Sequence, residues 1–274
     1  MRLGADVYRF DYRSCPSFLR PYLSIRISNL IRDIIMLIKS TIYKPTIIFI
    51  SKGNGISIYA TKILNRISET ILWYMDPLDG NFNDELREKI KECSLIVCGL
   101  RGPFEESKKI NEKSYFVHEG FDPMVDCPIN VEEKEYDVSF IGKLKGKRKD
   151  YHKLYDFNII NGVYGKDHSQ AVSLSKINLN FVVDGTGTSD RTYKIMASKG
   201  FLLTEPWFGI EKDFVIGKDL DVFTSDSDFL DKINYYLINR KKRMKIASSG
   251  YRAVQKYSRN EFVKEIIKTF YIYK

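Results

Sequence analysis

The loop at residues 140–149 combines glycines with cations in a way that suits an anionic ligand. It reads Phe-Ile-Gly-Lys-Leu-Lys-Gly-Lys-Arg-Lys, follows an apolar run and precedes a helical stretch. Gly142 and Gly146 permit close approach of the backbone, and the surrounding side chains add positive charge. We expect Lys143 and Lys147 to contact a phosphate directly. The GxxxxGK[ST] spacing of a P-loop is absent, and a solvated basic turn is the alternative interpretation.

A second loop, residues 184–190, leads into another helical stretch. Thr188, Ser189 or Asp190 can cap that helix, whose free N–H groups and positive dipole end suit a diphosphate. Arg191 would add a bidentate partner for a phosphate oxygen. A capped helix with a surface arginine is the alternative. Both loops follow strands of the same expected domain, so we predict that they converge on one ligand, contacted here by Gly187, Thr188, Ser189, Arg191 and Lys194.

Candidate acid–base groups lie in the first half of the chain. Asp76 and Asp79 end an apolar run, and either can act as a general base toward a hydroxyl. His118 and Glu119 end the last apolar run before a change of composition. The alternatives are a turn started by Asp before Pro and a hydrogen-bonded histidine that closes a strand. The glycine turn at 52–55 is weak evidence for a ligand.

The elements that must position these residues alternate between short apolar runs and amphipathic helices, which is typical of parallel α/β architecture. We predict strands at 6–10, 46–50, 70–75, 95–98, 114–117, 136–141, 161–164, 177–183, 200–204 and 221–223. Predicted helices cover 24–40, 56–66, 84–92, 104–110, 150–157, 168–175, 189–198, 226–239, 241–256 and 260–271. Apolar residues at helical spacing in the first helix predict that it packs on a sheet: Leu30, Ile31, Ile34, Ile35 and Ile38.

The segment from Asp122 to Tyr136 contains two prolines and an acidic run, which is typical of a linker. We therefore predict two domains, residues 1–134 and 135–274, in agreement with the length of 274 residues.

Composition excludes several classes of protein. Hydrophobic residues make up 43% of the chain, too many for a disordered protein. Three histidines, and scattered cysteines at Cys15, Cys93, Cys98 and Cys127, argue against a structural metal or a disulfide framework, and favour reduced thiols. The N-terminus has no apolar stretch typical of a secretory signal, so we expect a cytoplasmic protein.

The net charge of +9 attracts phosphates on a nucleotide, a nucleic acid or an anionic membrane. Because the basic residues are spread along the chain and no nucleic-acid-binding motif is present, we expect no specific nucleic acid partner. Peripheral contact between the basic surface and a membrane is compatible with the charge. Oligomeric state is not readable from the sequence.

Several spaced motifs together resemble the CgeB-type (spore maturation protein-like) glycosyltransferases of the GT-B group. The segments that carry the resemblance are 140–142 (FIG), 175–180 (SKINLN), 189–193 (SDRTY), 200–205 (GFLLTE) and 116–123 (FVHEGFDP). The resemblance implies two Rossmann-like domains facing across a cleft, with a nucleotide-sugar held mainly by the second. It also implies chemistry without a metal or a separate cofactor, and a last helix that crosses back to the first domain.

The sequence departs from the family pattern in the site and at the N-terminus. The pair of glutamates of the wider group maps to Thr186 and Lys194, and a lysine cannot accept the hydrogen bonds that a carboxylate accepts from ribose hydroxyls. We also expect a shortened N-terminal domain that lacks the usual opening strand and its glycine loop.

Two hypotheses follow. The chain is a glycosyltransferase that moves a sugar from a nucleotide-sugar to a hydroxyl acceptor, with Asp76 or His118 on the acceptor side and Arg191 among the groups that stabilise the diphosphate. Alternatively, it is a noncatalytic protein of the same fold that binds a nucleotide or another ligand. The sugar, the base, the acceptor and the stereochemical outcome stay open.

Overall fold

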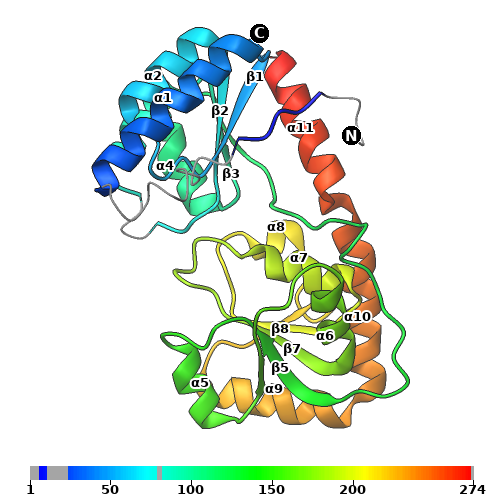
Figure 1. Cartoon of the computed structure of the whole chain (residues 1–274). Helices are drawn as coiled ribbons and strands as arrows, with labels where there is room; N and C mark the ends of the chain where they lie inside the picture. Colours follow the sequence, from blue (N-terminus) through cyan, green and yellow to red (C-terminus); the bar gives the residue numbers. More distant parts are fainter. Residues whose placement is uncertain (1–5, 11–23, 79–81, 273–274) are drawn as a thin grey trace. The chain divides into compact units, whose positions relative to one another are not determined.

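The computed structural model describes residues 6–10, 24–78 and 82–272. The chain divides into two compact units (Figure 1). The first contains the described residues up to Cys98 together with Pro103–Phe116, and the second contains Gly99–Gly102 and the chain from Val117 onward. Cys15, Asp79 and the ends of the chain lie outside the described residues.

The first unit is built on a parallel four-stranded sheet of order β1-β2-β3-β4. Its strands are β1 (Ile47–Ser51), β2 (Glu69–Tyr74), β3 (Leu95–Cys98) and β4 (Ser114–Phe116), and its helices are α1 (Ile25–Tyr43), α2 (Ile58–Ile67), α3 (Asp84–Glu92) and α4 (Arg101–Ile110). Every residue of β3 is buried, as expected for a central strand of a parallel sheet covered on both faces. Ser57 and Asn83 cap α2 and α3 through their side-chain oxygens, which sets where these helices begin.

Two predictions in this unit are wrong. Residues 6–10 form no strand; instead Tyr8 stacks on Tyr43 with ring centroids 4.0 Å apart, so contact between aromatic rings holds this segment. The apolar stripe of α1 does not pack on the sheet. Ile34 and Ile38 are exposed, whereas Met36 is buried.

Two neighbouring positions of α2 test where the core of the first unit begins. Leu64 is fully buried and Ile63 is exposed. We expect Leu64→Ala to lower the free energy of unfolding by about 2–5 kcal/mol, because it removes buried methyl groups and leaves a cavity. Ile63→Ala serves as the matched control and should change it by less than about 1 kcal/mol. Urea denaturation followed by circular dichroism measures both, and equal losses would contradict this assignment of the core.

The second unit contains a parallel five-stranded sheet of order β6-β5-β7-β8-β9. The strands are β5 (Tyr136–Ile141), β6 (Asn158–Ile160), β7 (Ser175–Asn180), β8 (Leu202–Thr204) and β9 (Asp221–Val222). The helices are α5 (Arg148–Leu154), α6 (Lys166–Leu174), α7 (Asp190–Ala197), α8 (Ile210–Asp213), α9 (Asp226–Ile238), α10 (Arg240–Val254) and α11 (Arg259–Ile272), with a 3₁₀ turn at Gln255–Tyr257.

Helices cover both faces of this sheet (Figure 1). One hydrophobic cluster joins the sheet to α6 and α7, and a second joins it to α9 and α10. In β5, Phe140 belongs to the second cluster and Ile141 to the first, because successive side chains of a strand point to opposite faces.

The strand predicted at 161–164 is wrong, because β6 ends at Ile160. Gly162 and Gly165 follow it with φ angles of +75° and +55°, so the chain turns where a strand was expected. The segment predicted as a linker has no helix or strand before Tyr136, but it is anchored to α6. The backbone N–H groups of Cys127 and Ile129 donate to the hydroxyls of Ser169 and Ser173.

Candidate functional site

The strand order of the second unit marks one position at the edge of its sheet. The chain goes from β5 outward to β6 and then returns to β7 on the other side of β5. In open α/β sheets, ligands bind beyond the carboxyl ends of the strands at the point where the order reverses. Here that point lies between the ends of β5 and β7. The two loops singled out in the sequence, within 140–149 and 184–190, correspond to the connections 142–147 and 181–189, which leave the sheet at this point.

Arg191 joins the two sides of this switch point. Its Nε donates to the carbonyl of Ile141, at the end of β5, over 2.7 Å, and its Nη1 donates to Oδ1 of Asn180, at the end of β7, over 3.0 Å. The guanidinium also lies over the ring of Phe140, 4.8 Å from its centroid. The side chain therefore points back to the sheet from the first turn of α7, and two of its nitrogens are committed to the protein.

Burial, together with the smaller effect of the nearby charge of Arg148 and against the opposing charge of Asp190, lowers the pKa of Arg191 to about 10. Because this pKa is still well above 7, the guanidinium stays charged at neutral pH. Arg148 lies over Phe140 as well, 5.0 Å from the ring centroid, and donates from Nη1 to the carbonyl of Lys143. Two guanidinium groups thus meet at one ring beside the loop that follows β5, and they form a site of concentrated positive charge.

Gly142 allows the close approach of Arg191 to this loop. Its φ of +146° favours glycine, and its N–H donates to the carbonyl of Ile160 over 2.8 Å. A Cβ atom at this position would lie 3.0 Å from Nη2 of Arg191 and 3.1 Å from the ring of Phe140. A side chain would therefore displace the guanidinium or the loop.

The predicted cations of this loop have different surroundings. Lys143 is exposed. Lys147 forms an ion pair with Glu205 over 2.8 Å, and the same Glu205 oxygen accepts from the N–H of Val182 over 2.7 Å. Glu205 follows β8, so this carboxylate links the loops after β5, β7 and β8. Of the two lysines, Lys143 has the amine more available for an added anion.

The residues before α7 are partly engaged within the protein. Thr188 is buried, and its hydroxyl contacts that of Thr192 over 2.6 Å. Ser189 is the N-cap residue, but its side chain makes no capping hydrogen bond. The N–H of Asp190 donates to Oε2 of Glu119 over 3.1 Å, so a carboxylate of the chain occupies part of the helix end predicted to hold a diphosphate.

Gly187 and Lys194 complete the predicted donor-binding set. A Cβ atom on Gly187 would lie 2.7 Å from the side chain of Leu100, so glycine is required there for close packing. Lys194 forms an ion pair with Asp190, one turn earlier on α7, over 2.5 Å. Its charge is therefore balanced locally.

His118 belongs to a polar and aromatic cluster in the second unit. Its Nδ1 lies 2.8 Å from the hydroxyl of Tyr193, and its Nε2 lies 3.3 Å from Oδ1 of Asp213. The ring of Tyr257 packs against it with centroids 4.0 Å apart. Arg101 donates to the same Asp213 oxygen over 2.6 Å. With both ring nitrogens near these partners, His118 is suited to holding α7 in place.

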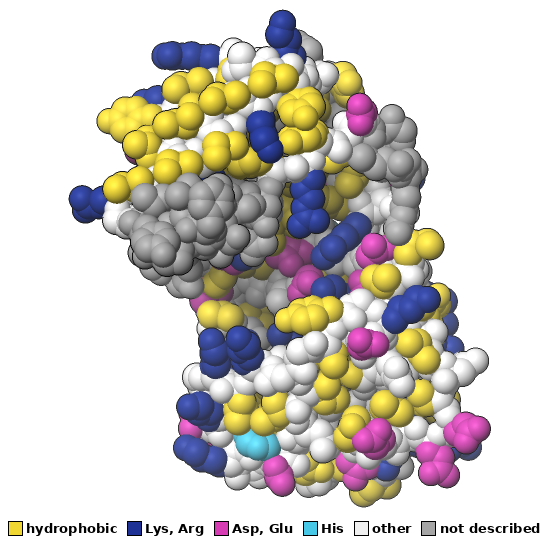
Figure 2. Space-filling model, in the orientation of Figure 1, with side chains coloured by type: hydrophobic (Ala, Val, Ile, Leu, Met, Phe, Trp, Pro, Cys, Tyr) yellow, Lys and Arg dark blue, Asp and Glu magenta, His cyan; other side chains and the backbone are white. Residues whose placement is uncertain are grey.

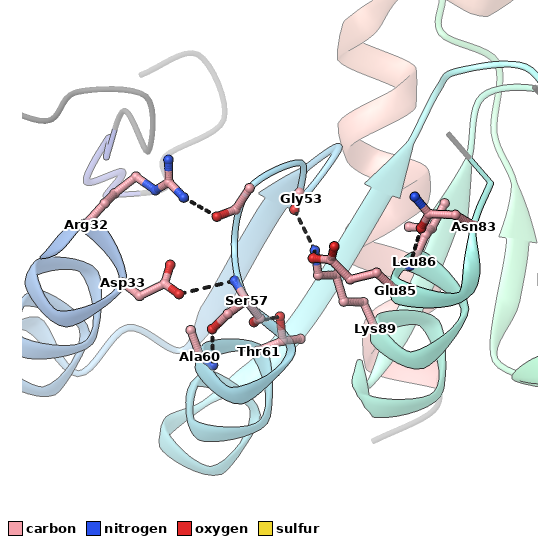
Figure 3. A network of polar contacts seen from close by, with 11 residues as sticks. Arg32, Asp33, Gly53, Ser57, Ala60, Thr61, Asn83, Glu85, Leu86 and Lys89 are labelled. Atoms are coloured by element: carbon pink, nitrogen blue, oxygen red, sulfur yellow. Dashed lines mark hydrogen bonds and ion pairs between the residues drawn. The ribbon is translucent and has the colours of Figure 1, made fainter. Parts of the chain in front are cut away.

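Asp76 lies in the first unit, just after β2, and forms an ion pair with Lys52 over 2.5 Å. Lys52 begins the glycine turn between β1 and α2, and two buried cations, Arg32 from α1 and Lys89 from α3, contact this turn from two sides (Figure 3). Lys89 donates to the carbonyl of Gly53 over 3.1 Å, and Arg32 donates to the carbonyl of Gly55. The turn is thus held by interactions within this unit.

Buried His168, on α6, gives the second unit a predicted dependence on pH. Burial, with smaller contributions from the charges of Lys194 and Arg191 and against the opposing charge of Asp190, lowers its pKa to about 4. As the pH falls from about 6.5 to 4, the unfolded chain binds a proton that the folded chain does not. We expect this to remove about 3 kcal/mol of stability.

His168→Gln should lose less stability than the wild type over the same pH range, because the titrating group is gone. Urea denaturation at a series of pH values measures this, and an unchanged slope in His168→Gln would contradict the assignment.

Several residues of the site were missed in the sequence. Asn180 is buried, and its Nδ2 donates to the hydroxyl of Thr204 over 3.1 Å while its Oδ1 accepts from Arg191. A polar signal was present, since Asn178 and Asn180 interrupt an otherwise apolar strand. Glu205 directly follows a strand end, which is where functional side chains of such sheets lie. The sequence did not distinguish Arg148 from the other basic residues of the loop at 140–149.

A model of the glycosyl transferase-like family matches residues 128–267, which cover more than half of the chain and all of the elements that build the switch point. The chain belongs to this family. No curated protein matches it. Membership of the glycosyl transferase-like family makes the chain a glycosyltransferase by class, in agreement with the resemblance found in its motifs.

Solved glycosyltransferase structures share its fold. HepE of Anabaena in complex with UDP-glucose is 11% identical, with a TM-score of 0.69 over 87% of this chain and 81% of that one. A glycosyltransferase of Rickettsia africae is 10% identical, with a TM-score of 0.65 over 90% and 81% of the two chains. Sucrose-phosphate synthase of Thermosynechococcus elongatus is 7% identical, with a TM-score of 0.65 over 90% and 78%. The mixed α/β fold with parallel sheets therefore matches GT-B glycosyltransferases.

Proposed function

We propose that this chain transfers a sugar from a nucleotide-sugar to a hydroxyl acceptor, and that it is of the CgeB type within the glycosyltransferases. Family membership supports the reaction class, and the quoted motifs support the subfamily. The observation that carries the proposal is Arg191, whose guanidinium spans the switch point between β5 and β7 and stays charged there.

The donor diphosphate binds beyond the ends of β5 and β7. Among the described residues, Nε and Nη1 of Arg191 carry its hydrogen bonds to the protein, whereas Nη2 lies next to Gly142 and can donate to a phosphate oxygen. Exposed Lys143 lies on this loop, and the guanidinium of Arg148, from the first turn of α5, lies beside it. HepE, which shares the fold, was solved with UDP-glucose, and this supports a donor of the same chemical class.

In the reaction, the acceptor oxygen forms a bond to the anomeric carbon while the bond from that carbon to the diphosphate oxygen breaks. The diphosphate leaves with the electron pair, and the fixed cations around Gly142 stabilise its developing charge. Because these cations belong to the chain, transfer proceeds without a metal. Asp76 is the proposed base for the acceptor proton: Lys52 pairs with its Oδ1, and a carboxylate has a second oxygen, whereas both nitrogens of His118 have partners within the protein.

Isothermal titration calorimetry with UDP, GDP, ADP and dTDP tests donor binding first. We expect one of them to bind, with an affinity that EDTA leaves unchanged. No binding to any of the four would overturn the proposal. An assay for release of sugar from the nucleotide-sugar of the nucleotide that binds then distinguishes an enzyme from a noncatalytic nucleotide-binding protein.

That second candidate is a noncatalytic nucleotide-binding protein, and Lys194 is the observation in its favour. This lysine stands where the resemblance implies a glutamate, and it is paired with Asp190. Nucleotide binding without transfer or hydrolysis of any matching donor would support this candidate over the enzyme.

We also propose a cytoplasmic location. The free cysteines among the described residues, Cys93, Cys98 and Cys127, support a reducing compartment.

A further inference from the structure

Helix α1 is turned with its apolar side outward. Ile27, Leu30, Ile34, Ile38 and Ile42 recur at helical spacing, and each of these side chains is between 46% and 69% exposed. A surface helix of a globular protein ordinarily buries such a stripe and exposes its polar side. We call these five residues the α1 stripe.

The opposite side of α1 is held inward by polar contacts. Arg32 and Asp33 are 8% and 5% exposed. Arg32 donates to the carbonyl of Gly55, and Asp33 accepts from the N–H of Ser57 over 3.2 Å (Figure 3). Rotating the helix to bury the stripe would break these contacts and expose Met36. The outward position of the stripe is therefore a property of the fold of this unit.

The neighbouring helix α2 extends the apolar surface with Tyr59 and Ile63, both exposed. Figure 2 shows hydrophobic side chains gathered over α1 and α2, with Lys and Arg side chains at the margins and among them. Contiguous apolar surface of this kind marks a site of interaction with a protein or a membrane.

Charge decides between these partners. Apart from Asp33, which is buried, α1 and α2 contain no acidic residue. Their exposed margins carry Arg26, Lys44 and Arg66. A second copy of the chain would bring like charges together around the same stripe, whereas an anionic bilayer satisfies both the apolar side chains and the cations.

We propose that the α1 stripe, with Tyr59, Ile63 and the basic margin, binds the surface of an anionic lipid bilayer. The side chains enter the boundary between headgroups and acyl chains, and the helix lies in the plane of the membrane. None of the helices among the residues described here is long and apolar enough to cross a bilayer. The contact goes beyond the proposed function and does not depend on it.

Flotation of the full chain with vesicles tests this proposal. We expect binding to phosphatidylcholine vesicles that contain about 30 mol% phosphatidylglycerol, and little to pure phosphatidylcholine. The double variant Ile34→Glu/Ile38→Glu should lower the partition coefficient at least about tenfold. Ile238→Glu, at an 82% exposed position of α9, is the matched control and should bind like the wild type.

The contribution of the basic margin to vesicle binding is tested with separate variants. Lys44→Glu and Arg66→Glu should each weaken binding by about fivefold or more, and about 0.5 M salt should weaken the wild type. Because all these positions are exposed, the variants should keep the fold, which circular dichroism verifies. Absence of vesicle binding by the wild type, or equal binding by Ile34→Glu/Ile38→Glu, would overturn the proposal. So would a dimer in light scattering that this double variant abolishes, since the stripe would then bind a second copy.

Discussion

Replacing Arg191 by alanine should lower kcat/KM for sugar transfer at least about 100-fold, which is the typical effect of removing one donor to a developing negative charge. Two causes act together. The variant loses the cation at the switch point, and it releases the carbonyl of Ile141 and the amide of Asn180 from a shared partner. We expect the free energy of unfolding to fall by about 3 kcal/mol as well, because hydrogen bonds to a charged group are lost.

Steady-state kinetics, calorimetry with a nucleoside diphosphate and urea denaturation separate these causes. Arg252→Ala, at an exposed position of α10, is the matched control and should change none of the three. Arg191→Lys keeps the charge but cannot reach both acceptors, so it should fold and bind nucleotide with intermediate affinity. If Arg191→Ala or Arg191→Lys bound the nucleotide as the wild type does, the assigned role of Arg191 would be wrong.

Gly142→Ala should weaken nucleoside diphosphate binding at least about 30-fold, a loss of about 2 kcal/mol. The added Cβ would lie 3.0 Å from Nη2 of Arg191, so the guanidinium must move or the loop must shift. Gly217→Ala is the control for the free-energy cost of placing alanine at a positive φ. Gly217 also has a positive φ, +75°, and a Cβ there would meet nothing within 4 Å.

Both glycine variants should lose about 1 kcal/mol of stability for the unfavourable backbone conformation. Only Gly142→Ala should lose nucleotide affinity. Calorimetry on the two variants and the wild type measures the difference. Equal affinities in Gly142→Ala and Gly217→Ala would contradict the close approach of Arg191 to the loop as the basis of the site.

Much of the fold was predictable because local patterns suffice for it. Strand β3 was predicted with its observed bounds, since Leu95–Cys98 is a short apolar run between polar helices. Helix α3 was also predicted with its observed bounds, Asp84–Glu92, and in the structure Asn83 caps it and acidic residues lie in its first turn. The strand expected at 161–164 is wrong because Gly162, within this segment, and Gly165, directly after it, turn the chain with positive φ angles, so turn chemistry outweighs the apolar pattern.

The direction in which α1 faces could not be read from its periodicity. A helical stripe shows that one side is apolar, but not which side meets the rest of the protein. Arg32 and Asp33 decide this through contacts with a turn more than twenty residues later. No local signal in the sequence reports those contacts.

Part of the site was also predictable from local patterns. Strand ends followed by glycine loops identify Gly142 and Arg191 from the sequence. The roles of other residues depend on distant partners. His118 meets Tyr193 and Asp213, Lys147 meets Glu205, and these pairs form only when the strand order brings the loops together. That order is a property of the folded sheet.

Hydrogen–deuterium exchange of the full chain, with and without the nucleoside diphosphate that binds in calorimetry, shows whether the ligand lies at the switch point. We expect slower exchange in peptides that cover 141–149 and 184–191, the loops on the two sides of the switch point. Protection confined to other parts of the chain, with these two loops unchanged, would contradict it.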